Sequence, residues 1–154
     1  MAKLAVVQKA PIFLDKQQTI VLAVSTIEEA ARHGAELVVF TEAFIPGYPT
    51  WVWRLRPGAD WGLSETLHHR LLKNAVVMES DDLVPLYEAA KRYHTTIVCG
   101  IEERDSKLSQ STLYNTIVTI DSNGELLNKH RKLMPTNPER MVWGVWRCIG
   151  FKSG

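Results

Sequence analysis

Apolar residues along this chain fall into short uninterrupted runs and into longer runs spaced by three and four residues. Leu4–Val7 and Leu37–Phe40 are uninterrupted apolar runs, which predict buried strands. Between them, Gln17–His33 has apolar residues at helical spacing, and Gly34 follows as a C-terminal cap because glycine enters the left-handed region at little cost. Strand, helix and strand in this order predict a βαβ unit with parallel strands.

The middle of the chain contains a segment with neither period, followed by two predicted helices. Ala43–Trp61 is rich in Pro, Gly and Trp and is expected to form a long loop. One helix is expected to begin at Ser64, with leucines at helical spacing on one face, and another covers Asp82–Tyr93. This part of the chain therefore adds helices and no strand to the predicted βαβ unit.

The later part of the chain has the pattern of strands. Thr95–Ile101 predicts one strand, and Thr112–Ile120 and Leu126–His130 predict a hairpin. The turn is placed at Asp121–Gly124, because its Asn-Gly pair tolerates positive φ. From Leu133 onward the pattern predicts no regular element. The fold class expected from all these elements is α/β.

Composition narrows the function classes. The 154 residues are 45% hydrophobic and 23% charged, with a net charge of +1, which gives no electrostatic reason to expect nucleic acid or an anionic membrane as partner. The N-terminus turns polar too early for a signal peptide, and no apolar stretch reaches the ~18 residues of a membrane span. Two cysteines do not form a disulfide framework, so we expect a cytoplasmic protein.

Three charged residues are candidates for chemistry. Glu42 follows a predicted parallel strand, where α/β folds place their sites, although a solvated charge at a strand end would look the same. Lys132 lies in the basic run Lys129–Lys132, and such runs are usually solvated. Glu139 follows a proline and could simply be an acid in the first turn of a helix. Position alone does not separate these alternatives.

The sequence motifs around these residues indicate their function better than their positions do. Phe40–Pro49, His130–Thr136 and Pro138–Gly144 each resemble motifs of the nitrilases, within the carbon–nitrogen hydrolase superfamily. Val98–Arg104 and Leu113–Ile120 resemble the strands of that family. The resemblance implies an α-β-β-α sandwich, with residues 1–144 as the N-terminal part of the domain and about half of the family fold. We therefore expect an inner sheet face without its partner layer, and a marginally stable, aggregation-prone chain.

The same resemblance implies a reaction and roles. Nitrilases convert a nitrile to a carboxylic acid and ammonia through a cysteine thioimidate and thioester, with no metal or organic cofactor. Glu42 would be the general base, Lys132 would stabilise developing negative charge, and Glu139 would hold Lys132 and the attacking water. These shared roles predict that the Glu42 carboxylate and the Lys132 ammonium lie within one ion-pair contact, ~4 Å. An amidase of the same superfamily is the alternative, although the wording of the motifs favours a nitrilase. The family also implies a homo-oligomer.

Aromatic residues follow Glu42 closely. Tyr48, Trp51 and Trp53 are candidates for lining the substrate pocket, and Trp61 lies a little further along. The alternative is that these rings only pack the loop between the predicted strand and helix.

The nucleophilic cysteine expected from the family is missing. Cys99 lies among apolar residues of a predicted strand, which predicts a buried structural thiol. Cys148 comes 16 residues after Lys132, too early for the family nucleophile. We therefore expect a truncated chain that is inactive by itself. A different class of function, a non-catalytic fragment that associates with intact homologous subunits, remains open.

The last residues, 145–154, depart from the family text. The resemblance to nitrilases extends as far as Val142–Gly144. Nitrilases then continue with a sequence similar to Phe-Gly-Asp-Ala-Ser-Gly, whereas this chain continues with Val-Trp-Arg-Cys-Ile-Gly. Inserting one G before TTT GGC GAT GCA TCG GG gives GTT TGG CGA TGC ATC GGG, which encodes all six observed residues. We therefore expect a frameshifted, non-native tail, and sequencing of the gene tests this expectation.

Overall fold

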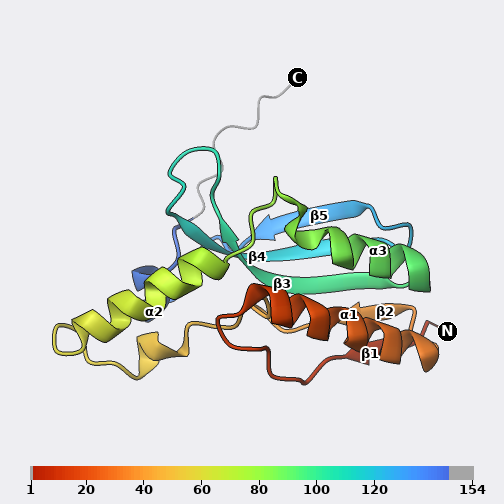
Figure 1. Ribbon diagram of the computed structural model, residues 1–154, viewed down its shortest axis with the longest axis horizontal. Helices are drawn as coiled ribbons and strands as arrows, with labels where there is room; N and C mark the ends of the chain where they lie inside the picture. The colour runs from red at the N-terminus through yellow and green to blue at the C-terminus, as the bar shows by residue number, and fades with distance from the viewer. Residues whose placement is uncertain (1, 146–154) are drawn as a thin grey trace.

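The protein is a single mixed β-sheet with its helices on one face (Figure 1). The computed structural model describes residues 2–145. The strand order is β1-β2-β3-β4-β5. β1, β2 and β3 run parallel to one another, and β4 is antiparallel to both β3 and β5. The strand bounds are β1 Leu4–Val6, β2 Leu37–Val39, β3 Thr96–Arg104, β4 Leu113–Ile120 and β5 Leu126–Arg131.

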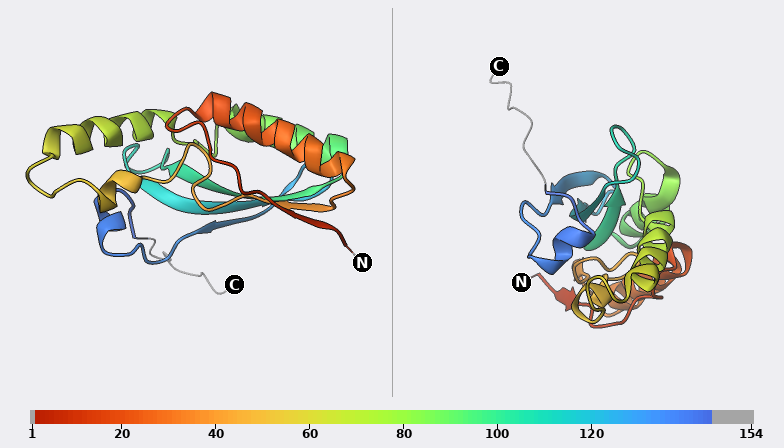
Figure 2. Two further views of the ribbon diagram at one scale, coloured as in Figure 1. Left: turned by 90° about the horizontal axis from the view of Figure 1, so that it is seen from below. Right: turned by 90° about the vertical axis from the view of Figure 1, so that its left-hand side faces the viewer.

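α1 and α3 form a layer over the sheet, and α2 continues on the same side beyond the end of the strands, as Figure 2 shows from the edge. Their bounds are α1 Lys16–Arg32, α2 Trp61–Asn74 and α3 Val84–Tyr93. Asp15 caps α1 by accepting a hydrogen bond from the backbone N–H of Gln18, as expected for an acidic N-cap. The main core lies between this layer and the sheet. Its fully buried members include Ala23, Ile27, Val38, Leu86, Ala90, Ile97, Cys99, Val118 and Ile120.

The opposite face of the sheet is exposed over β1 and part of β4, whereas Trp143 covers it at Glu102 of β3. Strand side chains alternate between faces, so the neighbours of the core residues point away from the helices. Leu4, Val6 and Ile117 are 55%, 66% and 40% exposed. A sheet with helices on one face only is what the predicted half of an α-β-β-α sandwich requires. The α/β fold class is confirmed.

The boundaries of several elements differ from the predictions. β3 continues through Glu102 and Glu103 to Arg104, beyond the predicted end at Ile101, and its buried carboxyl groups accept hydrogen bonds from the distant side chains of Trp143 and Arg131. α2 begins at Trp61, and short 3₁₀ segments cover Thr50–Trp53, Asp81–Leu83 and Pro138–Met141. The predicted turns are confirmed, with φ of +79° at Gly34 and +82° at Gly124.

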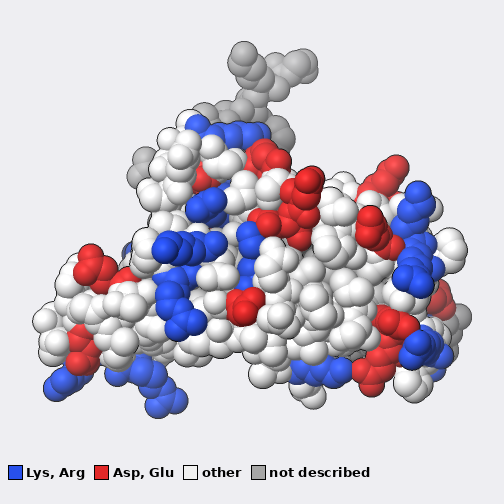
Figure 3. Space-filling view, in the orientation of Figure 1, with Lys and Arg blue, Asp and Glu red and all other residues white. Residues whose placement is uncertain are grey.

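Charge is spread without a dominant sign over the face that carries the helices. Figure 3 shows Lys and Arg side chains interspersed with Asp and Glu on this face. Within residues 2–145, the helices are too short or too polar to cross a membrane.

Candidate active site

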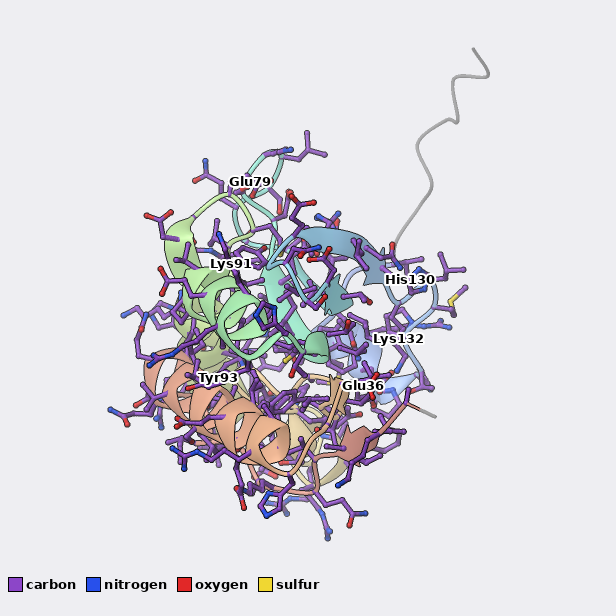
Figure 4. The ribbon with its side chains drawn as sticks, turned by 90° about the vertical axis from the view of Figure 1, so that its right-hand side faces the viewer. Glu36, Glu79, Lys91, Tyr93, His130 and Lys132 are labelled. Atoms are coloured by element: carbon purple, nitrogen blue, oxygen red, sulfur yellow. The ribbon has the colours of Figure 1, made fainter. Side chains whose placement is uncertain are left out.

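Three polar residues lie side by side across neighbouring strands on the open face. Glu102 of β3 is paired with Asn115 of β4, and the backbone N–H of Lys132 donates to the carbonyl of Asn115 over 2.8 Å. Lys132 directly follows β5, and Figure 4 shows it on the β5 side of the molecule, away from α1. The register of three strands thus brings together residues that are far apart in the sequence.

Glu42 reaches the same face through the loop after β2. The backbone stays beside β3, since Phe40 N–H donates to Val98 and Ile45 N–H donates to Gly100. Between these bonds the loop passes directly over Gly100, where a Cβ would lie 2.5 Å from the Cα of Glu42. A glycine at this position is therefore required for Glu42 to lie against the sheet.

The three candidate residues meet, as the sequence predicts for the first two. The Oε2 atom of Glu42 lies 3.6 Å from the Nζ atom of Lys132 and accepts a hydrogen bond of 3.0 Å from Asn115 Nδ2. The ammonium of Lys132 also donates to both oxygens of Glu139, at 3.2 and 3.0 Å. The side chain of Glu42 is 49% exposed, whereas that of Glu139 is 4% exposed. The expected contact of Glu42 with Lys132 is confirmed.

Glu139 is held as a carboxylate from several sides. It lies in the 3₁₀ segment Pro138–Met141 and accepts hydrogen bonds of 2.7 Å from both the Tyr48 hydroxyl and the backbone N–H of Thr136. Burial disfavours its charge, but the hydrogen bonds from Tyr48, Thr136 and Lys132 outweigh burial and lower the pKa of Glu139 to about 2. Glu139 is therefore a fixed negative charge that orients the Lys132 ammonium.

Aromatic rings border this cluster. The ring of Tyr48 packs edge-on against Trp143 with centroids 5.4 Å apart, and Trp53 Nε1 donates to the Tyr48 hydroxyl over 2.9 Å. Burial, with the charge of Glu139 nearby, raises the pKa of Tyr48 to about 12, so its hydroxyl stays a donor. Trp51 is buried and packs edge-on against Phe13 instead. Tyr48 and Trp53 thus border the cluster, while the Trp51 ring lies against Phe13.

Cys99 lies on the other side of the sheet. Its side chain is fully buried in the core between the sheet and the helices, and burial raises the pKa of its thiol far above the ordinary value. The predicted structural thiol is confirmed. Cys148 and the predicted frameshifted tail, apart from residue 145, lie outside the described residues.

Sequence reasoning missed three residues that complete the cluster: Asn115, Glu102 and Trp143. Asn115 lies in a strand, and Trp143 in a motif, whose sequences resemble the family. The sequence pattern does not show that Asn115 is a partner of Glu42. Glu102 follows an apolar run, and a carboxyl group there is the signal that could have marked it.

The arrangement offers a solvent-accessible carboxylate beside a fixed ammonium. Glu42 is placed to take and return a proton, because its carboxylate is exposed and paired by a single amide and a cation. Lys132 is placed to stabilise negative charge that develops next to it. Within residues 2–145, no group of three or more His, Cys, Asp or Glu side chains is arranged to hold a metal ion.

The fold is α/β, and the cluster of Glu42, Lys132 and Glu139 lies at the sheet face opposite the helices. Comparison with known proteins then gives the family. The family model of carbon–nitrogen hydrolases matches residues 3–150. The chain belongs to the carbon–nitrogen hydrolase family.

Curated relatives of the chain are nitrilases. It is 38% identical over 151 residues to a nitrilase from Meyerozyma guilliermondii, in a match that covers 98% of this chain and 44% of the relative. It is 41% identical over 142 residues to an aliphatic nitrilase from Rhodococcus rhodochrous, covering 92% of this chain and 37% of the relative. The chain therefore spans less than half the length of these relatives.

Solved structures share the fold. An amidase from Nesterenkonia sp. matches with a TM-score of 0.65 at 16% sequence identity, covering 95% of this chain and 48% of that chain. At this identity the likeness concerns the fold. The described sheet and its helices therefore correspond to about half of a nitrilase-superfamily structure.

Proposed function

We propose that this chain supplies the Glu-Lys-Glu part of a nitrilase site, which hydrolyses a nitrile to a carboxylic acid and ammonia. The observation that carries the proposal is the cluster of Glu42, Lys132 and Glu139. An exposed carboxylate 3.6 Å from an ammonium, which a nearly buried carboxylate holds from its other side, suits proton transfer beside a developing anion.

The proposed reaction consumes one nitrile and two water molecules. Glu42 takes the proton of a cysteine thiol, and the thiolate attacks the nitrile carbon to form a thioimidate. Lys132 stabilises the charge that develops on nitrogen and later on the oxygen of the tetrahedral intermediate. The first water adds to the thioimidate carbon to give that tetrahedral intermediate, and Glu42 passes its protons to the nitrogen, which departs as ammonia and leaves a thioester. Glu42 then activates the second water, whose attack breaks the C–S bond, releases the acid and returns a proton to the thiolate. Glu139 keeps Lys132 and that water in position.

The thiol in this scheme comes from outside the described residues. Cys99 is fully buried on the opposite face of the sheet, so its sulfur does not reach a substrate beside Glu42. We propose that residues 1–144 are the N-terminal part of the catalytic domain, that residues 145–154 are a non-native tail, and that the 154-residue chain alone does not hydrolyse nitriles.

Nitriles are the preferred substrate class because the curated relatives are nitrilases. Amides are the second candidate, since a solved structure of the same fold is an amidase and an amide would use the same three groups. Tyr48 and Trp53 are proposed as pocket residues, because the Tyr48 hydroxyl donates to Glu139 and the Trp53 indole donates to that hydroxyl. A cytoplasmic homo-oligomer completes the proposal.

Ammonia release from a panel of aliphatic and aromatic nitriles and amides tests this function. The chain alone should give no ammonia above background, and Cys148→Ala should change nothing. A second protein joins residues 1–144 to the C-terminal remainder of the Meyerozyma guilliermondii nitrilase, the part of that relative outside the match. Turnover should appear only in the joined protein. Robust turnover by the 154-residue chain that Cys148→Ala abolishes would overturn the proposal.

A further inference from the structure

A carboxyl group that the proposed reaction does not use lies buried beneath the cluster. Glu102 in β3 is fully buried, and its Oε2 atom accepts a hydrogen bond from the indole Nε1 of Trp143. Its Oε1 atom has no hydrogen-bond partner among the described residues. Within residues 2–145, no basic side chain forms an ion pair with it. A buried acid in this state requires an explanation, since polar groups in protein interiors are normally paired.

Trp143 connects Glu102 to the proposed site. Its indole ring is 2% exposed, and the Nζ atom of Lys132 lies 5.3 Å from the ring centroid, within cation–π range. The same ring packs edge-on against Tyr48, whose hydroxyl donates to Glu139. The backbone N–H of Trp143 also donates to the carbonyl of Glu139 over 2.8 Å. The Trp143 indole therefore contacts both Lys132 and Tyr48, the two side chains that donate hydrogen bonds to the Glu139 carboxylate.

Resting on the function proposed above, we propose that Glu102 is a positioning residue, which acts through Trp143 to fix the Lys132 ammonium and the Tyr48 hydroxyl against Glu139. The Glu102 backbone is itself anchored, because its N–H donates to Ile45 and its carbonyl accepts from Val76. The carboxyl group thus holds the indole from a rigid strand.

The protonation state of Glu102 suits this role. Burial, with the charges of Glu42 and Glu139 nearby, raises its pKa well above the ordinary value, although the Trp143 bond opposes the rise. As a neutral acid, Glu102 orients the indole without adding a third negative charge that would compete with Glu42 and Glu139 for Lys132.

The alternative is that Glu102 only fills the core. A leucine would then serve as well, and Lys132 would keep its place. The two alternatives differ in whether a substitution at Glu102 changes the position of the Lys132 ammonium.

Magnetic resonance of the ¹⁵N-labelled 154-residue chain separates these alternatives. The lysine ammonium signal of Lys132 is assigned by its absence in Lys132→Met, and the indole N–H signal of Trp143 by its absence in Trp143→Phe. Glu102→Leu should move both signals, and Trp143→Phe should move that of Lys132. Glu102→Gln should leave both near their original positions, because its amide oxygen accepts the same bond. Cys99→Ala, equally buried on the other face of β3, should leave the Lys132 signal unmoved.

A Lys132 signal that is unchanged in both folded Glu102→Leu and folded Trp143→Phe would overturn the proposal. A measurement without substitution guards against variants that do not fold: in the unaltered chain, the Trp143 ring current should shift the Cε protons of Lys132 upfield. Ordinary shifts for these protons would equally overturn it. Infrared spectra should show the C=O stretch of a protonated carboxyl group at neutral pH, and Glu102→Gln should remove it; absence of that band would contradict the neutral acid.

Turnover of the joined protein provides a kinetic readout. Glu102→Leu should lower kcat at least tenfold with KM retained, whereas Glu102→Gln should stay near the parent rate. Equal rates for both variants and the parent would contradict a positioning role. Because the spectra are recorded on the chain itself, a folded joined protein without any turnover would count against the proposed function and not against the coupling of Glu102 to Lys132.

Discussion

Glu139→Gln should remove a defined part of the acid sensitivity of this protein. The side chain of Glu139 is 4% exposed and accepts hydrogen bonds from Tyr48, Thr136 and Lys132. These bonds favour the ionised form and lower the pKa of Glu139 from its ordinary value of 4.5 to about 2. Since the pKa is lowered on folding, the carboxylate stabilises the folded state above pH 4.5, and this stabilisation is lost as the pH falls toward 2.

The size of the effect follows from the same values. A tenfold change in proton affinity corresponds to about 1.4 kcal/mol, so a fall from 4.5 to about 2 corresponds to about 3 kcal/mol. The free energy of unfolding of the parent chain should therefore fall by about 3 kcal/mol more than that of Glu139→Gln between pH 5 and pH 2. Tyr48→Phe, which keeps both charges and removes one donor, should reduce this difference by about 1 kcal/mol.

Urea unfolding at several pH values in this range measures the difference directly. Other carboxyl groups whose pKa is lowered in the folded protein, such as Asp82 and Glu103, are common to all three proteins and cancel in the comparison. The ¹³C shift of the Glu139 carboxyl carbon, followed over the same range, should report the titration itself. Parallel curves for the parent chain and Glu139→Gln would refute the reasoning, because Glu139 would then titrate alike in the folded and unfolded states.

Three further predictions concern packing around the site. Gly100→Ala should destabilise the chain by about 2–3 kcal/mol in urea, because its Cβ would lie 2.4–2.5 Å from the overlying loop backbone; an unchanged midpoint would contradict the close approach. Glu103→Leu should cost about 3 kcal/mol, since it removes a 2% exposed carboxylate that pairs with both Arg131 and Lys129; a loss below about 0.5 kcal/mol would show that these pairs contribute little. In a Cys148→Ala background, Cys99 should react with a thiol reagent only after unfolding, and fast labelling of the folded chain would contradict its full burial.

The fold could largely be predicted because its signals are local. Helical spacing identified α1, and uninterrupted apolar runs identified β1 and β2. β2 lies between β1 and β3, but β1 is the edge strand and leaves Leu4 and Val6 exposed, so the prediction of a buried strand there was wrong. The prediction failed at the end of β3, where Glu102 and Glu103 look like the start of a loop. Residues distant in the sequence reach these carboxyl groups: Trp143 donates to Glu102, and Arg131 and Lys129 pair with Glu103.

The site could be predicted in part for the same reason. Glu42, Lys132 and Glu139 stand in motif text, so the resemblance pointed to them, and the structure brings them together. Their geometry depends on strand register and on the loop over Gly100, which no local pattern encodes. The hydrogen bond from Asn115 to Glu42 is a tertiary contact of this kind.

The central claim is that Glu42, Lys132 and Glu139 act together on a nitrile, and turnover of the joined protein tests it most directly. Ammonia release is measured for the parent, for Glu42→Gln, for Lys132→Met and for Glu139→Gln, with the exposed Glu65→Gln as control. Loss of a general base or of a charge-stabilising group lowers rates by roughly 10²–10⁴-fold. The account predicts such losses in kcat for all three variants and none for Glu65→Gln. A folded Glu42→Gln variant with the parent rate would contradict it.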